Sequence, residues 1–175
     1  IDEGLVGSEM CIRDRSDSEK HILSEKIGIG SLRYNILKVQ PEKGFTFSME
    51  DALSIQGDSA PFAMYSHARM CSILDRYGAE VPPWSIEENL TESEIALLRF
   101  LVKWPQTVDS AIDKFGIHLI PSYVHQLSSK FNNFYRDCKV IGDVNESFRL
   151  NLVLVSKRIL FDALDILGVE APEKM

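Results

Sequence analysis

The sequence has no uninterrupted apolar run of the roughly 20 residues that a bilayer-spanning helix needs. Its most apolar stretch, residues 150–167, is interrupted by Ser156, Lys157, Arg158, Asp162 and Asp165. The first residues also lack the basic start and apolar centre of a secretory signal. We therefore expect neither a membrane span nor a membrane partner.

Cysteine is scarce, with only Cys11, Cys71 and Cys138 in the whole chain. Their number is odd, and neither they nor the four histidines have the spacing of metal ligands. Reduced thiols are typical of intracellular proteins. We expect a cytoplasmic protein with no disulfide framework and no metal site.

An excess of positive charge is missing as well. The 26 acidic and 19 basic residues give a formal net charge of −7. Proteins that bind nucleic acid without regard to sequence neutralise many phosphates and are usually basic, so the balance argues against that class and against DNA as a partner. An RNA partner would have to be held by basic residues gathered on one face and by base stacking.

Catalytic constellations are absent from the sequence too. It contains no paired carboxylates, no catalytic triad and no metal cluster. Gly28 and Gly30 stand one residue apart, but no preceding strand and no following Lys-Ser/Thr supports a phosphate loop. We expect no catalytic residue in this chain.

What the sequence does contain is a helix over residues 58–78 with both ends marked. Asp58 or Ser59 can accept hydrogen bonds from the first free backbone N–H groups, and Pro61 fits the first turn. Gly78 can adopt the left-handed conformation that ends a helix.

The two faces of this helix differ in chemistry at 3.6 residues per turn. One side carries Ala60, Met64, His67, Cys71 and Leu74, and the other carries Phe62, Tyr65, Arg69, Ser72 and Arg76. The first is a core stripe, in which His67 is a hydrogen-bonded core histidine rather than a base. The second interleaves rings with arginines, which suits stacking on unpaired bases and binding of phosphates. An ordinary packed helix with exposed residues is the alternative reading of the same spacing.

Residues 57–74 resemble a block of arginyl-tRNA synthetases, in which the helix that opens the C-terminal anticodon-binding domain reads Tyr-x-Gln-Tyr-Ala-His-Ala-Arg-x-x-Ser-Ile. The matching residues are Tyr65, His67, Ala68 and Arg69. The match is long, and its residues are in register, which makes it specific.

Three further blocks extend the resemblance. Residues 27–53 resemble the connector that joins the catalytic domain of these synthetases to their helical domain, in wording closest to archaeal-type members. Residues 131–140 resemble the Phe-Asn-x-Phe-Tyr block of the anticodon domain, and residues 168–175 resemble its Gly-x-x-x-Pro-Glu-Arg-Met end. Lys174 replaces the arginine of that end, and an ammonium group cannot form a bidentate contact.

The resemblance implies that the chain is the C-terminal part of an arginine–tRNA ligase and binds the anticodon loop of tRNA(Arg). The residues that it places near this loop are Phe62, Tyr65, Arg69, Phe131, Tyr135 and Met175. The full enzyme uses ATP and Mg at His-x-Gly-His and Lys-Met-Ser-Lys type loops, and neither loop is in this sequence. We therefore expect a missing N-terminal catalytic portion, no cofactor here, and no aminoacylation by this chain alone.

Some assignments stay open on the residues. Phe131 also lies on a core stripe of the helix over residues 121–138, so core filling and base contact are both consistent with its position. The members of this stripe are Val124, Leu127, Phe131, Phe134 and Cys138. Met175 fits a packing role at the terminus better than a base contact. For the chain as a whole, a free-standing helical RNA-binding module and a helical protein-interaction scaffold are the alternatives.

The expected fold is all-α, an antiparallel helical bundle preceded by a short connector. We divide the chain into a non-native linker over residues 1–15, a connector over 16–57 and an anticodon-binding domain over 58–175. A genuine N-terminal extension is the alternative for residues 1–15. The expected helices cover residues 16–27, 31–39, 58–78, 92–104, 105–115, 121–138 and 146–167, and Ser48 caps a further helix start. Thr91 and Glu94 fit a capping box, and Asn145 can cap the last helix. Gly28 and Gly30 separate the first two, and Trp84 packs the loop before the fourth. The inward residues of the fourth are Ile95, Leu98, Leu101 and Val102.

Overall fold

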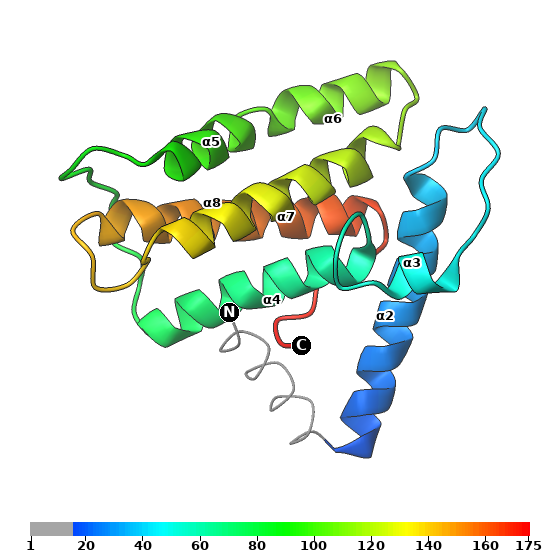
Figure 1. The fold of residues 1–175 in the computed structure, drawn as a ribbon, viewed down its shortest axis with the longest axis horizontal. Helices are drawn as coiled ribbons and strands as arrows, with labels where there is room; N and C mark the ends of the chain where they lie inside the picture. The colour runs from blue at the N-terminus through cyan, green and yellow to red at the C-terminus, as the bar shows by residue number, and fades with distance from the viewer. Residues whose placement is uncertain (1–15) are drawn as a thin grey trace.

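The computed structural model describes residues 16–175, and every regular element in this range is an α-helix (Figure 1). The helices are α2 (Asp17–Leu37), α3 (Met49–Leu53), α4 (Ala60–Tyr77), α5 (Glu92–Leu101), α6 (Trp104–Asp113), α7 (Leu119–Asp137) and α8 (Glu146–Ile166). The expected all-α fold is confirmed. The linker predicted over residues 1–15 lies outside the described residues.

Helices α4, α7 and α8 form the centre of a bundle, and α8 packs against α4, α5 and α7. Helix α6 continues the direction of α5 above α7, while α2 crosses the end of the bundle beside α3 (Figure 1). Within residues 16–175, no helix is both long enough and apolar enough to cross a membrane. Two of the three central helices, α4 and α7, carry predicted core stripes.

The predicted core stripe of α7 is confirmed. Its members Val124, Leu127, Phe131, Phe134 and Cys138 are at most 5% exposed. They pack with apolar residues of α4 and α8 in one continuous core. Burying a large apolar side chain stabilises the fold by about 1.5–3 kcal/mol, so this stripe fixes which side of α7 faces solvent.

The predicted helix break at Gly28 and Gly30 is wrong, because α2 runs uninterrupted through both. A Cβ atom at Gly30 would lie 2.5 Å from Met64 Cε and 3.2 Å from Val169 Cγ1. Glycine therefore lets α2 approach α4 closely. This packing compensates for a helix propensity about 1 kcal/mol below that of alanine.

The predicted connector packs directly on the bundle. Tyr34 of α2 is fully buried, and its hydroxyl lies 2.7 Å from Asp58 Oδ1 and 2.9 Å from Pro121 O. These contacts tie α2 to the start of α4 and the start of α7.

The predicted caps are confirmed at most helix ends. Ser59 Oγ accepts from Phe62 N–H, Gly78 has φ +68°, and Thr91 and Glu94 form the expected capping box. Asn145 stands at the start of α8 but makes no side-chain cap there. Its Oδ1 instead accepts from the N–H groups of Glu87 and Glu88, which fastens the loop between α4 and α5.

The inward face of α5 differs from the prediction. Leu97, Phe100 and Leu101 are buried, whereas Leu98 is 39% and Val102 is 70% exposed. Helix α5 packs against α7 and α8, and its covered side includes the predicted Leu101 but is rotated from the predicted one. Trp84, expected to pack the preceding loop down, is 66% exposed.

Candidate nucleic-acid interface

Helix α4 divides into two faces as its spacing predicts. Met64 and His67 are at most 1% exposed, whereas Tyr65 and Arg69 are partly exposed and Arg76 is exposed. The ring-and-arginine face therefore borders solvent along the length of α4. Its neighbour across a shallow gap is the C-terminal half of α7.

Arg69 is the centre of a cluster that joins α4 to α7. Its Cζ lies 4.6 Å from the ring centroid of Tyr65 and 5.0 Å from that of Tyr135. Its Nη2 donates to Tyr65 Oη at 2.7 Å, and its Nη1 donates to Asn132 Oδ1 at 3.0 Å. Two rings and an amide thus fix the plane of the guanidinium.

Asn132 is itself held in place from α4. Its Nδ2 donates to Ser66 Oγ at 3.2 Å, and Ser66 Oγ donates to Phe62 O at 2.9 Å. The chain of hydrogen bonds leaves Asn132 Oδ1 as the acceptor for Arg69. The sequence shows Asn132 in the Phe-Asn-x-Phe-Tyr block on the polar side of its helix, but no local pattern predicts its contact with Arg69.

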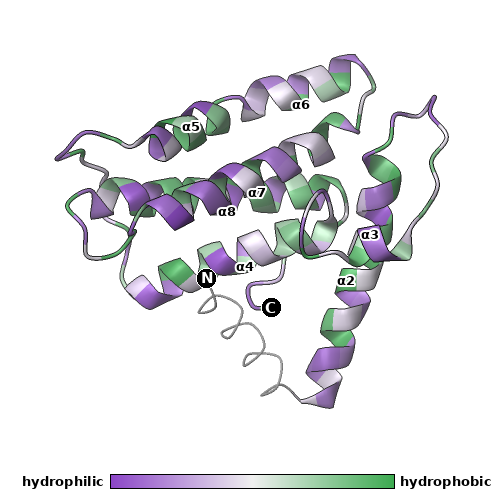
Figure 2. Cartoon of the chain, viewed as in Figure 1, coloured by the Kyte–Doolittle hydropathy of each residue, from purple (hydrophilic) through white to green (hydrophobic). Residues whose placement is uncertain are grey.

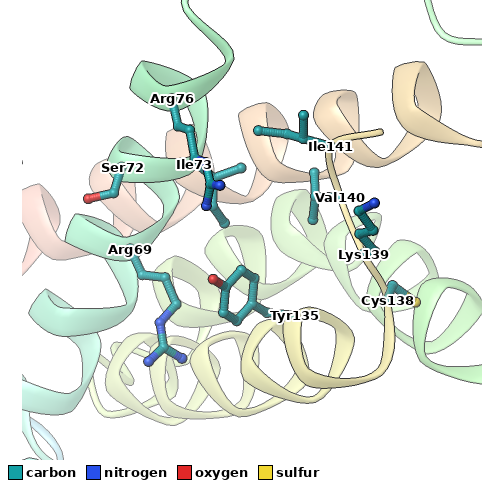
Figure 3. A pocket seen from close by; sticks show the side chains of 9 residues that line it. All are labelled: Arg69, Ser72, Ile73, Arg76, Tyr135, Cys138, Lys139, Val140 and Ile141. Atoms are coloured by element: carbon teal, nitrogen blue, oxygen red, sulfur yellow. The ribbon is translucent and has the colours of Figure 1, made fainter. Parts of the chain in front are cut away.

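A cleft of about 440 Å³ opens beside this cluster between α4 and α7. We call it the α4–α7 cleft; its lining residues are Arg69, Ser72, Ile73, Arg76, Tyr135, Cys138, Lys139, Val140 and Ile141. Figure 3 shows Arg69 beside Tyr135, with Arg76 further along α4 and Lys139 on the opposite wall. The lining includes three cations and no carboxylate.

The three cations of the cleft are not neutralised from within the described chain. Among residues 16–175, none of Arg69, Arg76 and Lys139 forms a salt bridge with a carboxylate. Arg76 lies on the predicted ring-and-arginine face of α4 but is not among the predicted site residues. Its position two helical turns after Arg69 on the same face indicates that both can line one surface. Lys139 comes from the segment after α7, and no helical spacing predicts it.

The burial of Phe131 favours core filling, one of the two roles that its spacing leaves open. Phe131 is 0% exposed, and a side chain without exposed surface cannot stack on a base. Its ring lies under that of Tyr135, with centroids 6.3 Å apart and planes 17° apart. Phe131 thus supports Tyr135, which is 42% exposed.

Phe62 and Met175 lie outside the cleft lining. Phe62 is partly exposed on α4, one turn before Arg69's neighbour Tyr65, with its ring 5.8 Å from that of His125. Met175 is partly buried against the core at the chain end. The structure therefore brings Tyr65, Arg69 and Tyr135 together, and neither Phe62 nor Met175 joins them.

His67 behaves as the core histidine that was predicted. Its Nδ1 lies 3.0 Å from Pro172 O, a contact that holds the C-terminal tail against α4. Burial lowers the pKa of His67 below its ordinary value, although the Pro172 carbonyl acts in the opposite direction. The neutral ring is the form that fits this site.

A buried ion pair behind the cleft holds its far wall. Arg149 Nε lies 2.6 Å from Glu94 Oε1, and Arg149 Nη1 lies 2.8 Å from both Asp143 Oδ1 and Lys139 O. Burial opposes ionisation of Glu94, but hydrogen bonds from Arg149 and Thr91 outweigh it, so the pKa of Glu94 is lowered. The same arginine fixes the backbone of Lys139, whose side chain lines the cleft.

The described residues offer no evident place for a metal ion. No group of three or more His, Cys, Asp and Glu side chains among residues 16–175 is arranged to bind one. The chemistry that the α4–α7 cleft can perform is recognition. Rings can stack on unpaired bases, and cations without carboxylate partners can bind phosphates.

Comparison with known proteins identifies relatives of this arrangement. The family profile described as "DALR anticodon binding domain" matches residues 63–175. The arginine–tRNA ligase of Thermococcus kodakarensis is 42% identical over 171 residues, which are 91% of this chain and 26% of that protein. The arginine–tRNA ligase of Pyrococcus abyssi is 41% identical over 188 residues and matches 100% of this chain and 30% of that protein.

Solved structures give the same answer for the fold. The arginyl-tRNA synthetase of Thermus thermophilus superposes with a TM-score of 0.85 at 30% identity, covering 93% of this chain and 29% of that one. The Plasmodium falciparum arginyl-tRNA synthetase superposes with a TM-score of 0.80 at 25% identity, covering 98% and 33%. The chain thus spans about a third or less of the length of these relatives.

Proposed function

We propose that this chain binds the anticodon loop of tRNA(Arg) in the α4–α7 cleft. The chain belongs to the DALR anticodon-binding domain family, and this membership is the starting point of the proposal. The observation that carries this proposal is the guanidinium of Arg69, which lies between the rings of Tyr65 and Tyr135 without a carboxylate partner among residues 16–175. An RNA loop supplies both of the groups that such a cluster binds, namely phosphates and unpaired bases.

Arg69 has hydrogen-bond capacity left for a ligand. A guanidinium carries five N–H donors, and two of those of Arg69 are used, one by Tyr65 Oη and one by Asn132 Oδ1. Five minus two leaves three donors for a phosphate or a base edge. Because its rings and amide partners already fix its plane, little side-chain entropy is lost when RNA binds.

Tyr135 supplies the stacking surface on the other wall. Its ring is 42% exposed and is backed by the buried ring of Phe131. Stacking of a base on an aromatic side chain contributes about 1–3 kcal/mol. Arg76 and Lys139 add charge at the two rims of the cleft. Phe62 and Met175 stay predicted contacts outside the cleft lining.

The activity of the relatives extends the proposal. In a polypeptide that carries this domain beside a catalytic region, anticodon binding would serve ATP-dependent joining of arginine to tRNA(Arg). Binding energy gained far from the reacting groups can be used to order the catalytic complex. ATP and Mg would then be bound by that region, and we assign them no residue of this chain.

Binding of labelled RNA hairpins tests the proposal. The protein is titrated into a hairpin with the stem and loop of the arginine anticodon arm, and into the same stem with another anticodon, while fluorescence anisotropy is recorded. We expect preference for the arginine anticodon. We also expect Arg69→Ala to weaken binding by about tenfold or more, since it removes a charge-assisted contact and a stacking partner.

Two measurements keep this test specific. Arg99→Ala removes an exposed arginine from α5, away from the cleft, and is expected to leave affinity unchanged. A thermal melt of Arg69→Ala is expected to stay close to that of the parent protein. Equal affinity of Arg69→Ala and parent for the arginine hairpin, or a loss of binding matched by a loss of folding, would refute the assignment of the cleft.

A further inference from the structure

The turn between α6 and α7 holds an aromatic side chain that the fold does not use. Phe115 is 91% exposed and has φ +49°. Its backbone is fixed in this left-handed conformation, because Phe115 N donates to Ile112 O and Gly116 N donates to Ala111 O. Glycine is the usual residue at such a helix end, so Phe115 costs conformational energy and buries almost none of its surface in return.

A polar groove of about 340 Å³ lies beside this turn, between α6 and α7. We call it the α6–α7 groove; its lining residues are Phe100, Lys103, Gln106, Thr107, Ser110, Lys114, Leu119, Ser122, Tyr123 and Gln126. Two lysines and five uncharged hydrogen-bonding side chains of Gln, Ser and Thr are among them, and no carboxylate is. The groove is therefore suited to an anion with several oxygen atoms.

A third lysine lies near the groove, outside its lining. Lys103 Nζ lies 5.9 Å and Lys130 Nζ lies 5.5 Å from the centroid of the same Phe100 ring, and Phe100 lines the groove. Within residues 16–175, neither these two lysines nor Lys114 forms a salt bridge with a carboxylate. Cations without an acidic partner leave a positive potential that attracts a polyanion.

Helix α7 connects the α6–α7 groove to the α4–α7 cleft. It runs from the turn after Phe115 to Tyr135, and its only carboxylate is Asp137 at the far end. Figure 2 shows hydrophilic segments in the middle and C-terminal part of α7 and apolar segments at its N-terminal end. At 1.5 Å per residue, the 16 residues from Leu119 to Tyr135 span about 24 Å, a length that a folded RNA arm can bridge.

We propose that the α6–α7 groove is a second RNA contact, in which Lys103 and Lys114 bind backbone phosphates and Phe115 stacks on an unpaired nucleotide. The ligand is the same tRNA whose anticodon loop binds at Arg69, and the groove contacts a part of that tRNA outside the loop. This inference therefore rests on the proposed function. The groove adds affinity for the whole tRNA without taking part in anticodon discrimination.

Substitutions at Phe115 separate this role from a structural one. Phe115→Gly removes the ring and relieves the left-handed backbone, so the melting temperature is expected to stay equal or rise. Affinity for whole tRNA is nevertheless expected to fall about fivefold or more, because one stacked base is lost. Phe115→Trp retains a ring and is expected to retain the affinity of the parent.

The lysines are tested through salt dependence. For Lys103→Ala/Lys114→Ala, the slope of log K against log salt for whole tRNA is expected to become shallower by about 1 to 2, as for the loss of two phosphate contacts. Arg99→Ala/Arg158→Ala removes the same net charge from exposed positions on α5 and α8, and its slope is expected to stay near that of the parent.

The outcomes distinguish the two proposals. If the isolated anticodon hairpin binds in an Arg69-dependent way while Phe115→Gly and the double lysine variant bind whole tRNA like the parent, the second contact is refuted and the proposed function stands. A salt slope that falls equally in the arginine control variant also refutes it, since the effect would then be one of net charge. If neither hairpin nor tRNA binds the parent protein, the proposed function itself fails.

Discussion

Arg69 and Arg149 are two guanidinium groups held in place by several partners each, yet the partners differ in kind. Arg149 is 7% exposed and lies between the carboxylates of Glu94 and Asp143. Arg69 is partly exposed and lies between the rings of Tyr65 and Tyr135, with an amide oxygen as its acceptor. The charge of Arg149 is satisfied inside the fold, whereas that of Arg69 is fixed in direction and left for a ligand.

This difference is more informative than burial or position alone. Both arginines connect two helices. Arg69 lines the α4–α7 cleft, whereas Arg149 lies behind it and donates to the carbonyl of the lining residue Lys139. A cation neutralised by carboxylates gains little from a phosphate. A cation oriented by rings and amides loses its side-chain conformational entropy on folding, before any ligand binds, and it retains its charge. The comparison predicts stability effects at Arg149 and binding effects at Arg69.

The largest expected effect is on folding, at Arg149. Arg149→Met leaves the buried carboxylate of Glu94 without its partner, and breaking a buried ion pair in this way costs about 3–5 kcal/mol. For a domain of this size, we expect the melting temperature to fall by about 10 °C. Circular dichroism melts of the parent protein and the variant measure the change.

A second substitution serves as the control for Arg149→Met. Glu94→Gln/Arg149→Met removes both charges, and glutamine can still serve the capping box with Thr91. We expect this double variant to recover much of the lost stability, since replacing both partners of a buried pair is often close to neutral. A double variant as unstable as Arg149→Met would mean that packing of the arginine, rather than its charge, stabilises the bundle.

The next largest effect is the pH dependence of stability that arises from the pair of Glu94 and Arg149. Because the pKa of Glu94 is lower in the folded chain, its ionised form stabilises the fold above the unfolded pKa of about 4.3. This contribution is lost as the pH falls from there through the folded pKa. We expect the melting temperature of the parent protein to drop more steeply than that of Glu94→Gln in melts between about pH 6 and pH 3. Parallel curves for the two proteins would contradict the assigned shift.

The sequence predicted the fold wherever local signals decide it. The cap at Ser59, the stop at Gly78 and the apolar stripe from Val124 to Cys138 each depend on a few neighbouring residues, and each is confirmed. The break at Gly30 was wrong, because only the approach of Met64 from another helix explains that glycine.

The prediction of the inward face of α5 was partly wrong for a related reason. The spacing of Leu98 and Val102 fits a core stripe, but the side of α5 that packs on α7 and α8 is rotated from them and shares Leu101 with the predicted stripe. Helical spacing gives the faces of a helix and leaves open which of them is covered.

The candidate site also has a part that local spacing predicts and a part that depends on the tertiary fold. Tyr65 and Arg69 lie one turn apart on one helix, so spacing alone placed them on a common face. Asn132 and Lys139 join them from α7 and the segment after it, which no local pattern predicts. The exposure of Phe131 was open for the same reason, since the packing of α7 decided it.

Arg69→Lys sharpens the comparison from the binding side. Lysine retains the positive charge but has no planar group to lie between the rings of Tyr65 and Tyr135. We expect affinity for the arginine anticodon hairpin to fall about fivefold to tenfold, with the melting temperature within about 3 °C of the parent, because an exposed cation–π contact contributes about 0.5–1 kcal/mol. Anisotropy titrations measure the first quantity and melts the second. Full retention of affinity would mean that charge alone matters at this position.

The smallest effect on stability is expected at a third arginine, Arg136, which has a carboxylate partner but is exposed to solvent. Arg136 Nε lies 3.1 Å from Asp137 Oδ1, and the two side chains are 72% and 42% exposed. Exposed pairs of this kind contribute about 0–1 kcal/mol, so Arg136→Ala should shift the melting temperature by less than about 3 °C. Its effect on hairpin affinity should be smaller than that of Arg69→Lys, because Asp137 already neutralises the charge. A loss of stability close to that of Arg149→Met would show that a carboxylate partner alone makes an arginine structural in this fold, whatever its burial.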